Sequence, residues 1–199
     1  MVEVNNCKHR YSLVCLAALI ALGAAASAYG QQASSELLNN PGFEGPYSPA
    51  PVQTGAGIIT GVLADGWLDE SSVSAVNVKY SEERDNAHGG QSAQMITIGG
   101  GGTVTVGQTV SGLLGGHAYR LSIWERGDGK ASVVIGLRGS ADGGEVFGQQ
   151  ELTSSSDWQN ITVNVTPGKD GGGFFFAEIK PAGAVCIDDA GMTEVAAKK

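Results

Sequence analysis

Trp124 is the residue whose type and position most suggest ligand chemistry. Around it, Tyr119, Leu121 and Ile123 alternate with polar residues, which predicts a strand with one buried face. Trp124 and Arg126 then belong to the opposite, outer face. An indole there can stack on the apolar C–H face of a sugar ring, and a guanidinium beside it can donate hydrogen bonds to hydroxyls. The alternative is that a loop covers Trp124.

Other candidate contacts come from neighbouring segments. Arg138 is expected on the strand adjacent to the indole. In the run Phe174–Phe176 the side chains alternate between two faces, and Phe176 shares its face with Glu178. If that face lines the binding surface, Phe176 adds an apolar contact and Glu178 an acceptor; a strand covered on both faces is equally consistent with the run. Tyr80, near a loop, is a candidate contact at the rim of a cleft.

The remaining aromatic and nucleophilic residues have simpler interpretations. Trp67 and Trp158 are expected to pack against the rest of the domain. His88 and His117 lie at predicted turns, where a solvated surface position is the default. The other two cysteines, Cys7 and Cys15, lie in the N-terminal segment that we interpret below as a signal peptide. Cys186 then has no partner cysteine, and we interpret it as a small buried apolar residue.

Catalysis finds little support in the sequence. Glycoside hydrolysis needs two carboxylates held about 5 to 10 Å apart across a cleft, and no strand pattern places such a pair. A nucleophile elbow of the G-x-S-x-G type and a histidine cluster with metal-ligand spacing are both missing. The sequence therefore favours a binding protein over an enzyme.

The elements that must position these residues are strands. Period-two alternation dominates residues 119–123, 132–137 and 161–165, and each of these strands is expected to have one buried face. Glycine-rich breaks separate the segments, including 99–102, 112–116 and 127–129. Short strands punctuated in this way predict an all-β fold, a two-sheet antiparallel β-sandwich or jelly roll. We interpret Pro41–Gly61, which is rich in Pro, Gly, Ala and Ser, as a long loop.

The first residues are typical of a signal peptide. Lys8 and Arg10 precede the apolar run Leu13–Ala26, and Ala26–Ala28 supplies a cleavage motif. We expect a signal peptide over 1–30, a short linker over 31–36, one β-sandwich over 37–195 and a tail over 196–199. The mature protein is then secreted, either extracellular or periplasmic, and no second hydrophobic stretch predicts a membrane span.

Charge narrows the choice of partner. The formal net charge is −8, whereas nucleic acids and anionic membranes select clustered Lys and Arg that neutralise phosphates. Nucleic acid is therefore excluded as an expected partner, and neutral ligands remain open.

An ordered series of short segments resembles a known family. The series comprises Leu37–Glu44, Gly66-Trp67, His88–Ala93, Gln108–Val110, Tyr119–Trp124, Trp158-Gln159 and Val185–Asp189. It is similar to the carbohydrate-binding modules of families four and nine, the endoglucanase-C type, which are galactose-binding-like jelly rolls. The resemblance implies a polysaccharide or cell-wall glycan as ligand, bound on an aromatic and polar concave face. It also implies association with glycoside hydrolases as partners.

The resemblance further implies a structural calcium ion. Glu44 and Asp188 would supply side-chain oxygens, and backbone carbonyls of Gly89–Gln91 would add further ligands. Strand parity leaves Asp189 as an alternative to Asp188, and all three acids could instead cap turns. Two other functions remain open: a structural or adhesive surface protein that keeps the sandwich without a cleft, and an enzyme of the jelly-roll hydrolase or lyase type.

Overall fold

Alternating apolar and polar residues form most of the strands, as the sequence predicts. The computed structural model describes residues 35–50, 57–71, 76–140, 144–180 and 183–196. The predicted signal peptide and the predicted cleavage site lie outside these residues. Within the described residues the secondary structure consists of strands, turns and bends, with no α-helix. None of these residues forms a helix that is long and apolar enough to cross a membrane.

Twelve strands are described. They are β1 (Tyr47–Pro49), β2 (Ile58–Ala64), β3 (Leu68–Asp69), β4 (Val76–Glu83), β5 (Ala93–Gly101), β6 (Val104–Leu113), β7 (Tyr119–Gly127), β8 (Ser132–Gly139), β9 (Val146–Thr153), β10 (Gln159–Val165), β11 (Gly171–Lys180) and β12 (Gly183–Glu194).

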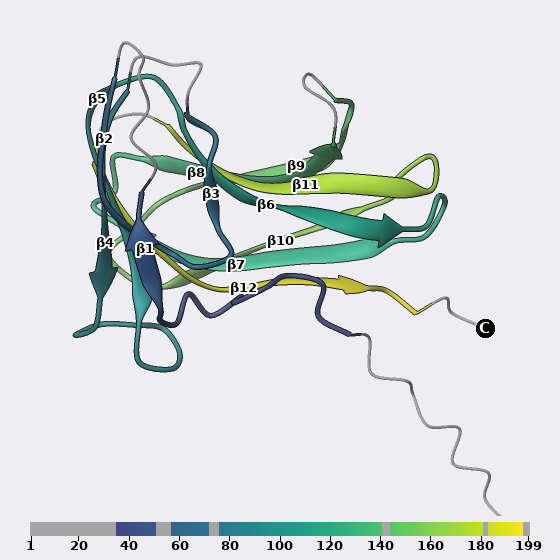
Figure 1. The fold of residues 1–199 in the computed structure, drawn as a ribbon, viewed down its shortest axis with the longest axis horizontal. Helices are drawn as coiled ribbons and strands as arrows, with labels where there is room; N and C mark the ends of the chain where they lie inside the picture. Colours follow the sequence, from purple (N-terminus) through teal and green to yellow (C-terminus); the bar gives the residue numbers. More distant parts are fainter. Residues whose placement is uncertain (1–34, 51–56, 72–75, 141–143, 181–182, 197–199) are drawn as a thin grey trace, which may run out of the picture. The chain divides into compact units, whose positions relative to one another are not determined.

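The strands form two sheets that pack as a sandwich. One sheet has seven strands in the order β1-β2-β4-β5-β12-β7-β10, and the other has five in the order β3-β6-β11-β8-β9. All described pairings are antiparallel except that of β2 with β4. In Figure 1 the long strands β6, β8, β9 and β11 of the smaller sheet lie above β7, β10 and β12 of the larger one. The predicted all-β jelly roll is confirmed.

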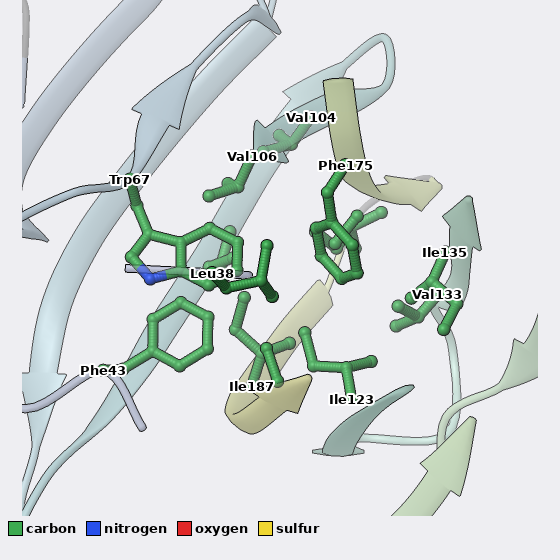
Figure 2. Close-up of a cluster of buried hydrophobic side chains, with 14 of the residues drawn as sticks. Leu38, Phe43, Trp67, Val104, Val106, Ile123, Val133, Ile135, Phe175 and Ile187 are labelled. Atoms are coloured by element: carbon green, nitrogen blue, oxygen red, sulfur yellow. The ribbon is translucent and has the colours of Figure 1, made fainter. Parts of the chain in front are cut away.

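The core lies between the two sheets. Tyr119, Leu121 and Ile123 of β7 are buried, and so are Phe175 and Ile179 of β11. Figure 2 shows apolar side chains from both sheets, together with Leu38 and Phe43 of the N-terminal segment, pointing into this space. Because the inward faces are used for packing, any ligand surface on these strands has to be built from the outward-facing side chains.

Three sequence-based expectations about the strands were wrong. The stretch Pro41–Gly61 is not one long loop, since it contains β1 and the start of β2. The break expected at Gly99–Gly102 falls largely inside β5, because glycine lacks a side chain but still pairs through its backbone. Strand β8 is buried on both faces rather than one, because Val134 is 1% exposed although it points away from the core.

Candidate functional site

Five of the six predicted ligand-binding residues lie on two different outer faces of the sandwich. Trp124 and Arg126 belong to β7 of the seven-stranded sheet, whereas Arg138 belongs to β8 and Phe176 and Glu178 to β11 of the five-stranded sheet. The hydrogen-bonded neighbours of β7 are β12 and β10. The expectation that Arg138 comes from the strand next to Trp124 is therefore wrong. Strand alternation gives the face of a residue but not the sheet that holds its strand.

The outward side of the five-stranded sheet, called here the five-strand face, has an aromatic floor. Val134, Phe174 and Phe176 form a hydrophobic cluster separate from the main core. The rings lie over glycines of the neighbouring strands: a Cβ atom at Gly107 would be 2.5 Å from Cε1 of Phe174, and one at Gly136 would be 2.5 Å from Cζ of Phe176. Glycine at these two positions lets both rings approach the backbone closely. Phe174 is 4% exposed and Phe176 2%.

Charged side chains surround this floor. The Arg138 guanidinium lies 4.9 Å from the centroid of the Phe174 ring, which is cation–π geometry. It also donates a hydrogen bond to the Glu70 carboxylate. Glu178 is paired with Lys180 at 3.8 Å. Arg138, Phe176 and Glu178, predicted separately, are thus brought to one face. Sequence reasoning missed Glu70, which follows the two-residue strand β3 and carries no pattern that would reveal it.

The outward side of the seven-stranded sheet, called here the seven-strand face, has a different aromatic group. The His88 ring stacks on the Trp124 indole with centroids 3.9 Å apart and an interplanar angle of 17°. It also meets Trp158 edge to face at 5.5 Å, and the Arg126 guanidinium lies 5.3 Å from the Trp158 ring centroid. His88 follows β4, so a loop residue covers one face of the Trp124 indole, as the alternative interpretation predicts.

Tyr80, Trp67, Trp158 and His88 lie in different environments. Tyr80 is 0% exposed and faces the core from β4, so its expected role at a cleft rim is wrong. Trp67 packs as expected, with its ring 4.2 Å from that of Phe43. Trp158 lies on the seven-strand face and is only half-buried. His88 is exposed, as expected for a residue at a turn. Its stacking on Trp124 and its contact with Trp158 have no sequence signal, because the loop approaches β7 only in the tertiary structure.

The three acids expected at a calcium site converge on the loop after β4. Asp188 Oδ2 accepts hydrogen bonds from the backbone N–H groups of His88 at 2.8 Å and Gly89 at 3.0 Å. Glu44 Oε1 accepts from the N–H of Gln91 at 2.8 Å. Asp189 Oδ2 lies 2.7 Å from Nδ1 of His88. The acids therefore fasten the loop between the N-terminal segment and β12.

In this arrangement hydrogen bonds occupy oxygens that the expected calcium site would use. Calcium binds oxygen ligands, whereas here Asp188 Oδ2 and Glu44 Oε1 accept hydrogen bonds from backbone N–H groups, so an ion would have to displace these bonds. The described residues also contain no group of three or more His, Cys, Asp or Glu side chains placed to hold a metal ion. Asp188 is fully buried; burial raises its pKa, although backbone N–H groups stabilise the ionised form. Strict strand alternation would place Asp189, and not Asp188, on the face shared by Val185 and Ile187. Asp188 is the buried residue instead, because the β12–β7 register shifts after Asp188 and Asp189 has a φ of 41°.

The fold is similar to those of solved carbohydrate-binding modules. A family 4 module matches with 20% identity and a TM-score of 0.57, over 79% of this chain and 99% of that module. A family 61 module, solved with β-1,4-galactotriose, matches with 18% identity and a TM-score of 0.51, over 81% of this chain and 100% of that one. The xylan-binding family 22 module of Paenibacillus barcinonensis matches with 12% identity and a TM-score of 0.51, over 83% and 97%. The sequence matches no protein-family model and no curated protein.

Proposed function

We propose that this chain, which has the jelly-roll fold of carbohydrate-binding modules, binds a polysaccharide on its five-strand face without catalysing a reaction. The observation that carries the proposal is the aromatic floor of Phe174 and Phe176, which is separate from the core and bordered by Arg138, Glu70 and Glu178. An apolar floor with a polar border suits sugars, because a pyranose ring has apolar C–H faces and a rim of hydroxyls.

The charged side chains would make the first contacts. Because Phe174 and Phe176 are nearly closed off, a sugar would first meet Arg138, Glu70 and Glu178. The Arg138 side chain is 31% exposed and that of Glu70 40%, so both can exchange their mutual hydrogen bond for bonds to hydroxyl groups. Moving Arg138 aside would also uncover the Phe174 ring for stacking.

Binding without catalysis is favoured by the partners of the two carboxylates. Glu70 is hydrogen-bonded to Arg138, and Glu178 lies beside Lys180. Both carboxylates are thus engaged by cationic side chains, whereas a glycosidase uses a pair of carboxyl groups that flank the scissile bond. We further propose, from the leader alone, that the mature protein is exported and meets its glycan outside the cytoplasm, where glycoside hydrolases acting on the same polymer would be its partners.

Affinity electrophoresis tests the proposal. The mature protein is run through gels that contain xylan, β-glucan or β-1,4-galactan, and we expect retention by at least one polymer. Replacing Arg138 and Glu178 together with glutamine should weaken that retention by about tenfold or more, since each removed charged hydrogen bond contributes roughly 1.5 to 3 kcal/mol. Arg120→Gln, on the exposed part of β7, is the matched control and should bind normally.

A structural or adhesive role is the second candidate. It is favoured by the near-complete burial of Phe174 and Phe176, which leaves little aromatic surface open. If the unaltered protein is retained by none of these polymers, this second function replaces the first. If the double variant is retained as well as the control, the polysaccharide does not bind on the five-strand face.

A further inference from the structure

A depression on the seven-strand face lies away from the proposed polysaccharide site. It has a volume of about 240 Å³, and its lining includes Met95, Arg126, Asp128, Ser156 and Cys186. Strand pairing explains its position: Cys186 of β12 lies directly between Met95 of β5 and Arg126 of β7. The side chains of these three neighbouring strands form a continuous surface, and the turn after β7 and the segment before β10 border it.

The floor of the depression is apolar and uncharged. Cys186 is 1% exposed, and burial raises the pKa of its thiol to about 12, so the thiol stays neutral at physiological pH. Met95 supplies a polarisable thioether beside it. Such a floor accepts the C–H groups of a ligand and does not attract ions.

Arg126 has hydrogen-bonding capacity that the described residues leave unused. Its Nε is buried without a hydrogen-bond partner, and the nearest carboxylate oxygen, Oε2 of Glu83, lies 3.9 Å from Nη2. Its guanidinium is held against the Trp158 ring instead. The buried Nε cannot reach a ligand, but a guanidinium has five N–H donors, and the Arg126 side chain lines the depression and is 19% exposed. Its Nη groups are therefore the ones positioned to donate to acceptors there.

Acceptors and a hydroxyl stand on the opposite side. Asp128 lies at the turn after β7, and its carboxylate is 35% exposed, while Ser156 contributes a hydroxyl group. A ligand that fits must therefore present acceptors to Arg126 and donors to Asp128. Arg126 lies near Glu83, and Asp128 is paired with Lys130 at 3.9 Å. Because each cation has a neighbouring carboxylate, the local charge does not favour an anion.

The depression has room for one sugar ring. A cavity of about 150 Å³ holds a benzene molecule, so this depression accommodates a six-membered ring with its substituents. We propose that it binds a single neutral sugar ring, with C–H groups on Cys186 and Met95 and hydroxyls between Arg126 and Asp128. The site shares no residue with the five-strand face, so the two can be tested independently.

Tryptophan fluorescence provides the test. Trp158 lies against Arg126, and the His88 ring contacts both Trp158 and Trp124. Trp67, in contrast, is buried in the core. Glucose, galactose, mannose and xylose are titrated into the mature protein up to about 0.1 M, since so small a ligand binds weakly. We expect at least one of them to change the emission with saturation. Arg126→Gln should weaken that sugar's binding by about tenfold or more.

Controls separate this site from the polysaccharide site. Arg138→Gln, on the five-strand face, should leave the fluorescence titration unchanged, and Arg126→Gln should leave retention by polysaccharide gels unchanged. If Arg126→Gln fails to fold by circular dichroism, the double variant Asp128→Asn with Ser156→Ala takes its place and should also lose binding.

Three results would overturn the proposal: no sugar changes the emission, the change survives in the variants that remove Arg126 or Asp128, or glucuronate binds more tightly than glucose. A competitor disaccharide that carries the bound sugar at its non-reducing end, with its reducing end converted to an alditol, distinguishes the two sources of such a ring. Competition identifies the non-reducing end of a chain as ligand, and failure to compete identifies the free monosaccharide.

Discussion

The aromatic side chains on the two outer faces of the sandwich differ in how far they are exposed to solvent. On the five-strand face, Phe174 and Phe176 come from β11, the central strand of its sheet, and lie close against glycines of the neighbouring strands. On the seven-strand face, Trp124 and Trp158 stand beside a loop and remain half-buried. The difference shows that an outward-facing aromatic side chain becomes buried when its neighbours in the sheet are small. It stays half-buried when a loop residue such as His88 covers only part of it.

The faces also differ in what holds them in place. The five-strand face depends on packing within one sheet and on the Arg138–Glu70 hydrogen bond. The seven-strand face depends on the loop after β4, which Asp188 and Glu44 fasten through backbone N–H groups. Substitutions should therefore affect stability through packing on one face and through loop attachment on the other.

We expect the largest loss of stability for Phe176→Ala, and a smaller loss for Trp124→Ala on the other face. Phe176 is nearly fully buried, so its truncation should lower the free energy of unfolding by about 3 to 5 kcal/mol. Trp124 is half-buried and loses mainly its stacking with His88, so about 1 to 2 kcal/mol is expected. Urea denaturation monitored by circular dichroism measures both. Equal losses would mean that the two faces are closed to the same degree.

The second effect comes from Glu125, which lies beside Trp124 in sequence but faces inward. Glu125 is 0% exposed, and neither carboxylate oxygen has a hydrogen-bond partner among the described residues. Burial raises its pKa from 4.5 to about 7. Between these values the folded protein keeps a proton that the unfolded chain has released, so stability falls as pH rises through this window and the loss is complete above about pH 7.

Glu125→Gln removes this titration and isolates its effect. The difference between the two pKa values corresponds to about 3 kcal/mol, so the variant should be more stable than the parent at pH 8 by up to that amount. At pH 4, where Glu125 is protonated in both states, the two proteins should unfold at nearly the same urea concentration. A parent and variant with parallel stability from pH 4 to 8 would contradict the raised pKa.

The smallest effect concerns the attachment of the loop. Asp188→Asn keeps the side-chain shape but removes the charge that accepts the N–H groups of His88 and Gly89, so we expect a loss of about 1 to 3 kcal/mol. Asp85→Asn, in the same loop but exposed, is the control for Asp188→Asn.

Because the carboxylates are occupied by N–H donors, a chelator should leave the melting temperature of the parent unchanged. A lower melting temperature with the chelator, restored by calcium, would support the metal site expected from the resemblance.

Much of the fold could be predicted because strand alternation is a local property. The segments 119–123, 132–137 and 161–165 all became parts of strands, and Tyr119, Leu121 and Ile123 point inward as expected. The packing of Trp67 and the burial of Cys186 also followed from residue type. These features depend on neighbours one or two residues away, which the sequence contains directly.

The composition of the two faces was decided by the tertiary structure alone. The sequence by itself determined that Trp124 and Arg126 point outward together, and it left open whether the face of Phe174 and Phe176 is exposed or covered. Only the pairing of strands placed Arg138 with Phe176 and Glu178 in one sheet and Trp124 in the other. Only the path of the loop after β4 brought His88 onto Trp124 and the N–H groups of that loop onto Asp188. These contacts join residues far apart in the chain, and the local alternation of apolar and polar residues does not determine which distant segments come together.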